Sequence, residues 1–153
     1  MSDDYIHVIP EEPGFVPDKA NGQSAVAYFK RIAPKADGIT VSVSKHLEFI
    51  HCGANFGKIQ CPSCEALIEL ETWQEWMDQD FHGKGKGFVL SRRALPCCGS
   101  SATLHDLEYE WPQGFARFNL RARNPNIGKL SKKHHRQFKQ LLGAGVRIVY
   151  EHF

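Results

Sequence analysis

The stretch GFARFNLRAR, residues 114–123, alternates apolar and polar side chains along most of its length. Its apolar positions include Ala116, Phe118, Leu120 and Ala122, and its polar positions are Arg117, Asn119, Arg121 and Arg123. Because neighbouring side chains of a strand point to opposite faces of a sheet, this pattern predicts a strand with one buried face and one exposed, basic face. A strand of this kind is typical of an antiparallel sheet that is covered on one side only.

The segments around this strand carry further patterns of apolar residues, from Gly38 to the end of the chain. The predicted strands are 38–50, 87–95, 114–123 and 145–153, and the predicted helices are 68–81 and 131–143. Ser131 is placed to cap the second helix and Gly143 to end it. The order β–α–β–β–α–β predicts an α+β fold of the ferredoxin-like class, a sandwich in which four antiparallel strands carry both helices on one face.

The first 22 residues show no such period and contain Pro10, Pro13 and Pro17. They predict an extended N-terminal arm (1–22), followed by a single α+β domain (23–153) that opens with a short helix. The first 18 residues hold five acidic and no basic side chains, which excludes a secretory signal peptide. No apolar run reaches the ~18 residues of a membrane span. We therefore expect a cytoplasmic protein with no membrane partner.

Two cysteine pairs follow predicted strands of the sheet. Cys61 and Cys64 stand in KIQCPSCEAL, and Cys97 and Cys98 stand in LPCCGS. In the predicted fold the first two strands run parallel, so their carboxyl ends, and both cysteine pairs, meet at one edge of the sheet. Cytosolic thiols stay reduced, and two converging cysteine turns are typical of structural zinc. The sequence therefore predicts one structural zinc ion, held by these four cysteines at the sheet edge.

The second cysteine pair departs from a regular zinc turn. A Cys-x-x-Cys turn that ends at Cys98 would need a cysteine where Leu95 stands. Either both Cys97 and Cys98 bind the ion, or only one binds and another side chain supplies the fourth ligand. The candidates for that ligand are Cys52, His51, His82 and His105. Two alternatives without a structural ion stay open, namely reduced core thiols and a redox-active Cys61–Cys64 pair.

Basic residues gather in the C-terminal part of the chain, where residues 117–153 hold nine Lys or Arg and one acid. The exposed sheet face would present Arg117, Asn119, Arg121, Arg123 and Arg147. This face suits either an acidic protein surface or the phosphates of a nucleic acid. Open sheets that recognise RNA supply aromatic side chains for stacking on bases, and the predicted face has few. We therefore expect a protein partner in preference to nucleic acid; the acidic arm folding over this face is the alternative without a partner.

The signatures of common enzyme classes are missing. The chain has no phosphate loop, no dinucleotide-binding glycine pattern and no HExxH helix. A catalytic zinc site needs an open position beside a general base, for which Glu65 or His105 would be the candidates. The deaminase signature contains PCxxC, whereas this chain has PCCG. A zinc- or thiol-dependent enzyme is therefore the last of the functional alternatives.

The stretches CPSC (61–64), PCCG (96–99) and WPQGFARF (111–118) together resemble a family of small uncharacterised bacterial proteins. The resemblance covers about residues 38–153 and implies a shared fold without an established activity. Single-domain bacterial proteins of this size that lack a catalytic signature are often inhibitors or immunity proteins for toxins. The predicted function is thus that of a zinc-stapled protein that binds a macromolecule, in its most specific form a toxin-immunity protein. Nucleic acid binding through Arg117, Arg121 and Arg123 is the alternative.

Overall fold

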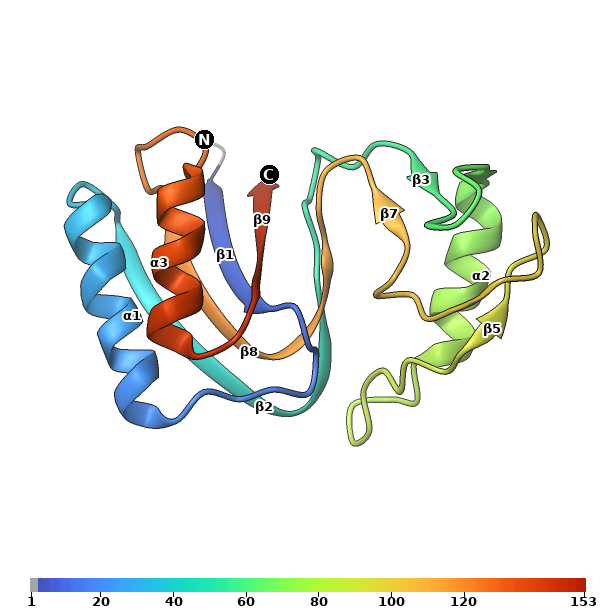
Figure 1. Cartoon of the computed structure of the whole chain (residues 1–153), viewed down its shortest axis with the longest axis horizontal. Coiled ribbons are helices and arrows are strands. Elements are labelled where there is room, and N and C mark those ends of the chain that lie inside the picture. Colours follow the sequence, from blue (N-terminus) through green and yellow to red (C-terminus); the bar gives the residue numbers. More distant parts are fainter. Residues whose placement is uncertain (1–2) are drawn as a thin grey trace.

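The computed structural model of the chain describes residues 3–153. Within this range it contains three helices, a four-stranded antiparallel sheet and two smaller sheets. The large sheet is built from β1 (Asp4–Pro10), β2 (Gly38–Ile50), β8 (Gly114–Arg123) and β9 (Val146–His152), in the order β2-β8-β1-β9. The helices α1 (Lys19–Ile32) and α3 (Lys132–Leu142) cover one side of it (Figure 1). The predicted α+β class is therefore confirmed.

Between β2 and β8 the chain forms a second unit, which we call the cysteine lobe (residues 51–113). The lobe contains β3 (Ile59–Gln60), β4 (Leu67–Ile68), α2 (Leu70–Asp80), β5 (Arg93–Ala94), β6 (Ser101–Ala102) and β7 (Glu108–Tyr109). Strand β3 pairs with β4 and β7, and β5 pairs with β6. In Figure 1 the lobe lies on the side of the large sheet that is turned away from α1 and α3. None of the helices in residues 3–153 has the length and hydropathy needed to cross a bilayer.

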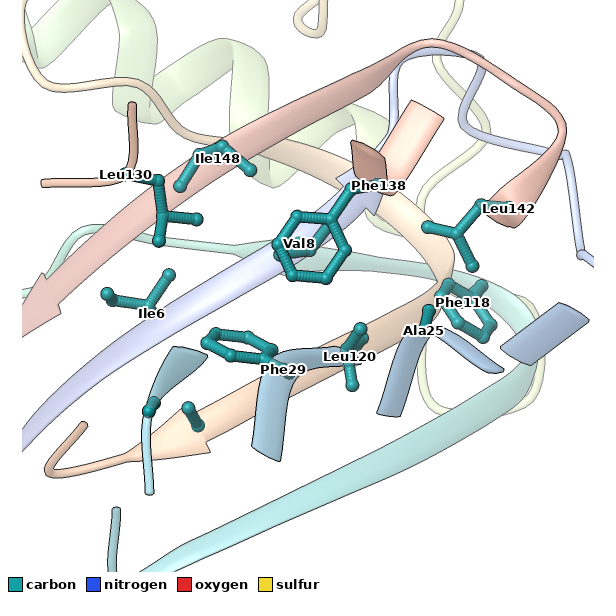
Figure 2. Packing of buried hydrophobic residues seen from close by; sticks show 12 residues of the cluster. Ile6, Val8, Ala25, Phe29, Phe118, Leu120, Leu130, Phe138, Leu142 and Ile148 are labelled. Carbon is teal, nitrogen blue, oxygen red and sulfur yellow. The ribbon is translucent and has the colours of Figure 1, made fainter. Parts of the chain in front are cut away.

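The main hydrophobic core fills the space between the large sheet and its two helices. Phe29 of α1 and Phe138 of α3 meet with ring centroids 5.2 Å apart, and both pack with Val8 and Leu120 of the sheet (Figure 2). All four side chains are fully buried, and each such burial contributes ~1.5–3 kcal/mol. A smaller core joins the other side of the sheet to the cysteine lobe and consists of Ile9, Ile50, Cys52, Ala116 and Val149.

The first strand of the sheet comes from the segment predicted to be an arm outside the domain. Strand β1 lies inside the sheet and pairs antiparallel with β8 and β9. It is buried on both sides, because Ile6 and Val8 face the helices while Ile9 packs against the cysteine lobe. Pro10 ends the strand and the other prolines follow it, so none of them interrupts the hydrogen-bond ladder. The predicted domain boundary at residue 23 therefore separates β1 from its own sheet. Residues 1–2 of the predicted arm lie outside the described part of the chain.

The helix ends agree with the sequence patterns at α3. The Ser131 hydroxyl accepts the N–H of His134, and the His134 ring in turn accepts the N–H of Ser131, which completes a capping box. Gly143 ends the helix in the left-handed conformation with φ of 80°.

The segment 87–95, predicted to be the second strand of the large sheet, belongs instead to the cysteine lobe. Its backbone N–H groups are drawn to a buried carboxylate, since Asp80 accepts from Val89, Leu90 and Ser91 at 2.8–3.2 Å. Those groups are therefore unavailable for a ladder with a neighbouring strand. Only Arg93–Ala94 is a strand, in the small hairpin with β6. Helix α2 forms as predicted, but it lies in the cysteine lobe, where Trp73 packs with Phe49 of β2 and Phe115 of β8 on the side of the sheet away from α1 and α3.

Candidate metal centre

Two turns of the cysteine lobe have the same pattern of backbone hydrogen bonds, which we call the turn frame. In the first turn, the N–H of Cys61 donates to Ala66 O at 2.9 Å and the N–H of Glu65 donates to Cys61 O at 3.0 Å. In the second, the N–H of Leu95 donates to Ser100 O at 2.9 Å and the N–H of Gly99 donates to Leu95 O at 2.7 Å. The fifth residue of each turn has a positive φ, 63° at Glu65 and 75° at Gly99. The first turn closes the β3–β4 hairpin and the second closes the β5–β6 hairpin.

The shared frame brings the four predicted cysteines together. The Sγ atoms of Cys61, Cys64, Cys97 and Cys98 all lie within 4.8 Å of one another. The Cys61–Cys98 separation is 3.7 Å and the Cys97–Cys98 separation is 4.0 Å. A tetrahedral ion with metal–sulfur bonds of about 2.3 Å would place its ligands about 3.8 Å apart. The cluster therefore has the size of a four-thiolate metal site, and no cysteine forms a disulfide.

The position of this cluster differs from the prediction. The prediction places it at one edge of the large sheet, because 38–50 and 87–95 would be parallel strands of that sheet whose carboxyl ends lie at the same edge. The structure builds it from two short hairpins of the cysteine lobe instead. Both Cys97 and Cys98 lie in the cluster, so both sulfurs of that turn are placed where they could hold an ion.

Hydrogen bonds within the turns favour thiolates at two of the sulfurs. The N–H groups of Cys64 and Ser63 point to Sγ of Cys61, at 3.5 and 3.4 Å, and they lower the pKa of Cys61 to about 6. The hydroxyl of Ser100 lies 3.1 Å from Sγ of Cys98 and lowers the pKa of that thiol. Such N–H···S and O–H···S contacts stabilise negative charge on sulfur.

Ionisation of further thiols in the cluster would need a positive charge nearby. Hydrogen bonding with the Cys64 side chain is the largest of the effects that raise the pKa of Cys97 to about 12. A further thiolate is therefore costly in so small a cluster without a positive charge beside it. A bound divalent ion would remove this cost, because it holds coordinating thiols in the deprotonated form. The four cysteines are thus a donor set that could hold a metal ion.

The alternative ligands lie elsewhere in the described part of the chain. Cys52 is buried beneath the sheet, where its thiol donates to Oε1 of Gln113 at 3.3 Å and burial raises its pKa. His105 accepts the N–H of Phe115 at Nδ1, and its Nε2 donates to Glu11 O. Among residues 3–153 the one group that could hold a metal ion consists of the four cysteines, without Cys52, His51, His82 or His105.

The predicted partner-binding residues do not form one free basic surface. Arg147 is the clearest departure, because its side chain is only 17% exposed and lies between the sheet and the cysteine lobe. Its Nη1 donates to His105 O at 3.0 Å and to Gln113 O at 2.8 Å, and its guanidinium also pairs with Glu11. Asn119 is also removed from the surface, since it is buried beside His7.

The other three arginines are held by neighbours in the sheet. Arg117 donates from Nε to Ser44 O at 2.9 Å, and Arg123 pairs with Asp3 at 3.3 Å. Arg121 is exposed and lies over the ring of Tyr5, 5.1 Å from its centroid. Only Arg121 therefore combines an exposed position with a neighbouring aromatic ring.

Sequence reasoning missed a second polar group, on the side of the sheet away from the helices. His7 and Glu151 are both buried, and Nε2 of His7 lies 2.7 Å from Oε1 of Glu151. The signal in the sequence was the alternation of Tyr5, His7 and Ile9 with Ile6 and Val8, inside the segment that was interpreted as an arm.

The comparisons with known proteins give no further information. The chain matches no protein-family model, no curated protein and no solved structure.

Proposed function

We propose that this chain is a zinc-stapled binding protein, in which one structural zinc ion holds the cysteine lobe together. The observation that carries the proposal is the four-sulfur cluster, whose Sγ atoms lie within 4.8 Å of one another on two turns of one frame. The lobe is otherwise poor in regular structure, with five strands of two residues each in the described chain. A metal that cross-links two such hairpins stabilises the lobe directly.

The chemistry of the donor set supports zinc. Four thiolates in tetrahedral arrangement are the ligands of zinc or of an iron centre. With all four positions taken by protein sulfur, no position is left for a water or a substrate, which is the arrangement of structural sites and not of catalytic ones. This supports a binding protein over a zinc-dependent enzyme, and it fits the reducing cytosol in which thiolates persist.

The test is metal analysis combined with cobalt substitution of the reduced protein. We expect one zinc per chain, and a cobalt derivative with strong thiolate charge-transfer bands and a tetrahedral spectrum that added azide leaves unchanged. The variant Cys64→Ser should lose the stoichiometric ion, whereas Cys52→Ala, which alters the cysteine outside the cluster, should retain it. A spectrum that shifts with azide would mean an open position and favour an enzyme. Absence of stoichiometric metal in the wild-type protein would overturn the proposal.

The partner in this proposal is a protein, and the observation that favours it is the free edge of β2. In the described structure this strand pairs with β8 along one edge, and its only other bridge is the isolated one between Leu47 and Phe88. It exposes Val41 and Val43, at 39% and 54%. Beside them lies an apolar groove of about 410 Å³ between β2 and α1, lined also by Val26 and Phe118. A strand of a partner protein added to this edge would gain main-chain hydrogen bonds and place a side chain in the groove. A toxin-inhibiting immunity protein is the specific form of this proposal.

Edge-strand binding can be tested with matched surface variants. Affinity capture from bacterial lysate should retain a partner that Val43→Glu loses, while Leu67→Glu, which changes an exposed leucine (68%) of the cysteine lobe, keeps it. The captured complex should survive moderate salt, since it rests on main-chain bonds and apolar contact. Equal retention by both variants would exclude the β2 edge. Self-association of the wild-type chain that Val43→Glu abolishes would identify a second copy as the occupant.

We also infer that the large sheet is a ferredoxin-like sandwich into which the cysteine lobe is inserted. The elements β1, α1, β2, β8, α3 and β9 follow the order β–α–β–β–α–β, and the strand order β2-β8-β1-β9 supports this topology.

A further inference from the structure

The side of the sheet that faces away from the helices contains a hollow of about 450 Å³. Strands β1, β8 and β9 supply its buried polar residues, and Thr40 and Ser42 of β2 line it from the side. Phe49, near the end of β2, and His51, at the start of the cysteine lobe, line it on the side of the lobe. The hollow is separate from the cysteine cluster, and it shares the strands β2 and β8 but no lining residue with the apolar groove beside the β2 edge.

Three buried polar side chains form a connected row in this hollow. Asn119 lies 3.0 Å from Nδ1 of His7, and Nε2 of His7 lies 2.7 Å from Oε1 of Glu151. The relative exposures of His7, Glu151 and Asn119 are 4%, 6% and 9%. With the Asn119 amide donating to Nδ1, the His7 ring donates from Nε2 to the carboxylate. The row therefore fixes the Glu151 carboxylate rigidly, and buried polar groups held in this way are characteristic of recognition sites.

The second oxygen of Glu151 has no comparable partner in the described structure. The nearest candidate is Nδ1 of His51, which lies 3.5 Å from Oε2. That nitrogen also receives the N–H of Gly53 at 3.2 Å, so in neutral His51 it acts as an acceptor and cannot donate to Glu151. The Oε2 atom is therefore an oriented, mostly buried acceptor for which a ligand N–H is the natural complement.

Aromatic rings surround this acceptor. Tyr5 stacks beside His7 with ring centroids 5.9 Å apart, and Phe153 meets Tyr5 edge to face at 5.8 Å. Phe153 is 57% exposed, so its ring offers surface to a flat ligand. Arg121, whose guanidinium lies over the Tyr5 ring at 5.1 Å, supplies positive charge and hydrogen-bond donors at the rim.

We propose that this hollow binds a nucleobase. A nucleobase is flat and stacks on aromatic side chains, carries N–H donors for a carboxylate on one edge, and is joined to a phosphate that an arginine can meet. A purely anionic ligand would be repelled by Glu151 and by Glu48, which also lines the hollow. An apolar ligand would cover Oε2 of Glu151 without offering it a hydrogen bond, which is costly. A metal ion is disfavoured, because His7, His51 and Glu151 do not form a ligand group in the described chain.

The base can come from a free nucleotide or from an unpaired position of a single strand, and titration distinguishes these sources. The metal-loaded protein is titrated calorimetrically with GMP, AMP, CMP and UMP, with the matching nucleosides, with ribose 5-phosphate and with short single-stranded RNA. We expect at least one nucleotide to bind. Its nucleoside should bind too, with an affinity that is lower by no more than one phosphate contact contributes. RNA that binds much more tightly than any mononucleotide identifies a strand as the source, and equal affinity identifies the free nucleotide.

Variants test whether the bound base occupies this hollow. Glu151→Gln keeps the side-chain volume but removes the charged acceptor, and Tyr5→Leu removes the ring. Each should weaken binding about tenfold or more. Glu108→Gln and Tyr28→Leu, placed outside the hollow, should bind as the wild type does. Thermal melting of each variant shows whether it is folded, and the exposed Arg121→Gln serves as a further probe if Glu151→Gln is not. No binding of any nucleotide at millimolar concentration, ribose 5-phosphate binding as tightly as the nucleotides, or unchanged affinity in Glu151→Gln and Tyr5→Leu would each overturn the proposal.

Discussion

Leu95 occupies in the second cysteine turn the place that Cys61 holds in the first. Both residues donate their N–H to the residue five positions later and accept the N–H of the residue four positions later. Both are buried in the same apolar cluster of the cysteine lobe. The second turn compensates for the missing thiol by placing Cys97 where the first turn has Ser63. The second turn thus supplies its two sulfurs from positions 97 and 98, while its backbone hydrogen bonds stay the same as those of the first turn.

This equivalence predicts a rescue experiment. Cys97→Ser should weaken metal binding at least about tenfold, because it removes one of four thiolates. Adding Leu95→Cys to that variant should restore much of the affinity, since the new thiol would start from the position that Cys61 uses. Competition with a coloured chelator measures both effects. A double variant that binds no more tightly than Cys97→Ser would mean that the two frames are not functionally equivalent.

Cys52 should react more slowly with an alkylating reagent than Cys64 and Cys98 of the cluster. Burial raises the pKa of Cys52, and its thiol donates to Gln113, so little thiolate is present near neutral pH. In the metal-loaded protein we expect slow labelling at all five positions. After chelation the exposed thiols of Cys64 and Cys98 should react before Cys52, and mass spectrometry of peptides locates the label. Fast labelling of Cys52 in the chelated protein would show that the lobe has separated from the sheet; urea-unfolded protein gives the reference rate.

The sequence predicted those elements that have one buried side. Strand β8 alternates in burial toward its C-terminal end, where Leu120 and Ala122 are buried and Arg121 and Arg123 are exposed. Helices α2 and α3 show helical spacing because each buries one side. Strand β1 is buried on both faces from Ile6 to Pro10. Its sequence therefore does not alternate regularly between apolar and polar residues, and His7 looks like an interruption of an apolar run. The prediction of a sheet strand at 87–95 was wrong for another reason, because the buried Asp80 carboxylate accepts backbone N–H groups that a strand would have used.

The two sites differ in how far a sequence can foretell them. The four cysteines can be recognised as a candidate metal-binding group from residue type and local spacing, even though their predicted place at the edge of the large sheet was wrong. The pair His7–Glu151 joins residues 144 positions apart. It exists only because β1 pairs with β9. Without that pairing, a histidine near one end of the chain and a glutamate near the other give no reason to be considered together.

Arg147 should contribute more to stability than its ion pair alone suggests. Its guanidinium donates to the carbonyl oxygens of His105 and Gln113, which ties the cysteine lobe to β9. Arg147→Met keeps the aliphatic length but leaves those carbonyls unpaired, at an expected cost of about 2–4 kcal/mol. Glu11 is 53% exposed, so Glu11→Gln should cost at most about 1 kcal/mol. Urea unfolding of metal-loaded protein measures both, and equal losses would mean that the ion pair dominates.

His105 should make the stability of the chain fall in mild acid. Burial, followed by the charge of Arg147, lowers the pKa of His105 below the 6.5 of an exposed histidine, while the largely exposed Glu11 and Asp106 act in the opposite direction. Both ring nitrogens are used in the neutral form: Nδ1 accepts the N–H of Phe115 at 3.0 Å, and Nε2 donates to Glu11 O at 2.8 Å. Protonation of Nδ1 would remove the first of these bonds and leave a buried charge beside Arg147.

The sign of the effect follows from proton linkage. Below about pH 6.5 the unfolded chain binds a proton at this residue that the folded chain excludes, so the free energy of unfolding decreases as the pH falls. The contribution of neutral His105 is complete above that pH and is lost below it. The control His105→Gln can still accept from Phe115 and donate to Glu11, so its stability should depend less on pH between about pH 5 and 7. Acid also displaces thiolate-bound metal, but that loss is common to both proteins, so the difference between them isolates the imidazole. An NMR titration in which the His105 ring titrates at or above 6.5 would contradict this account.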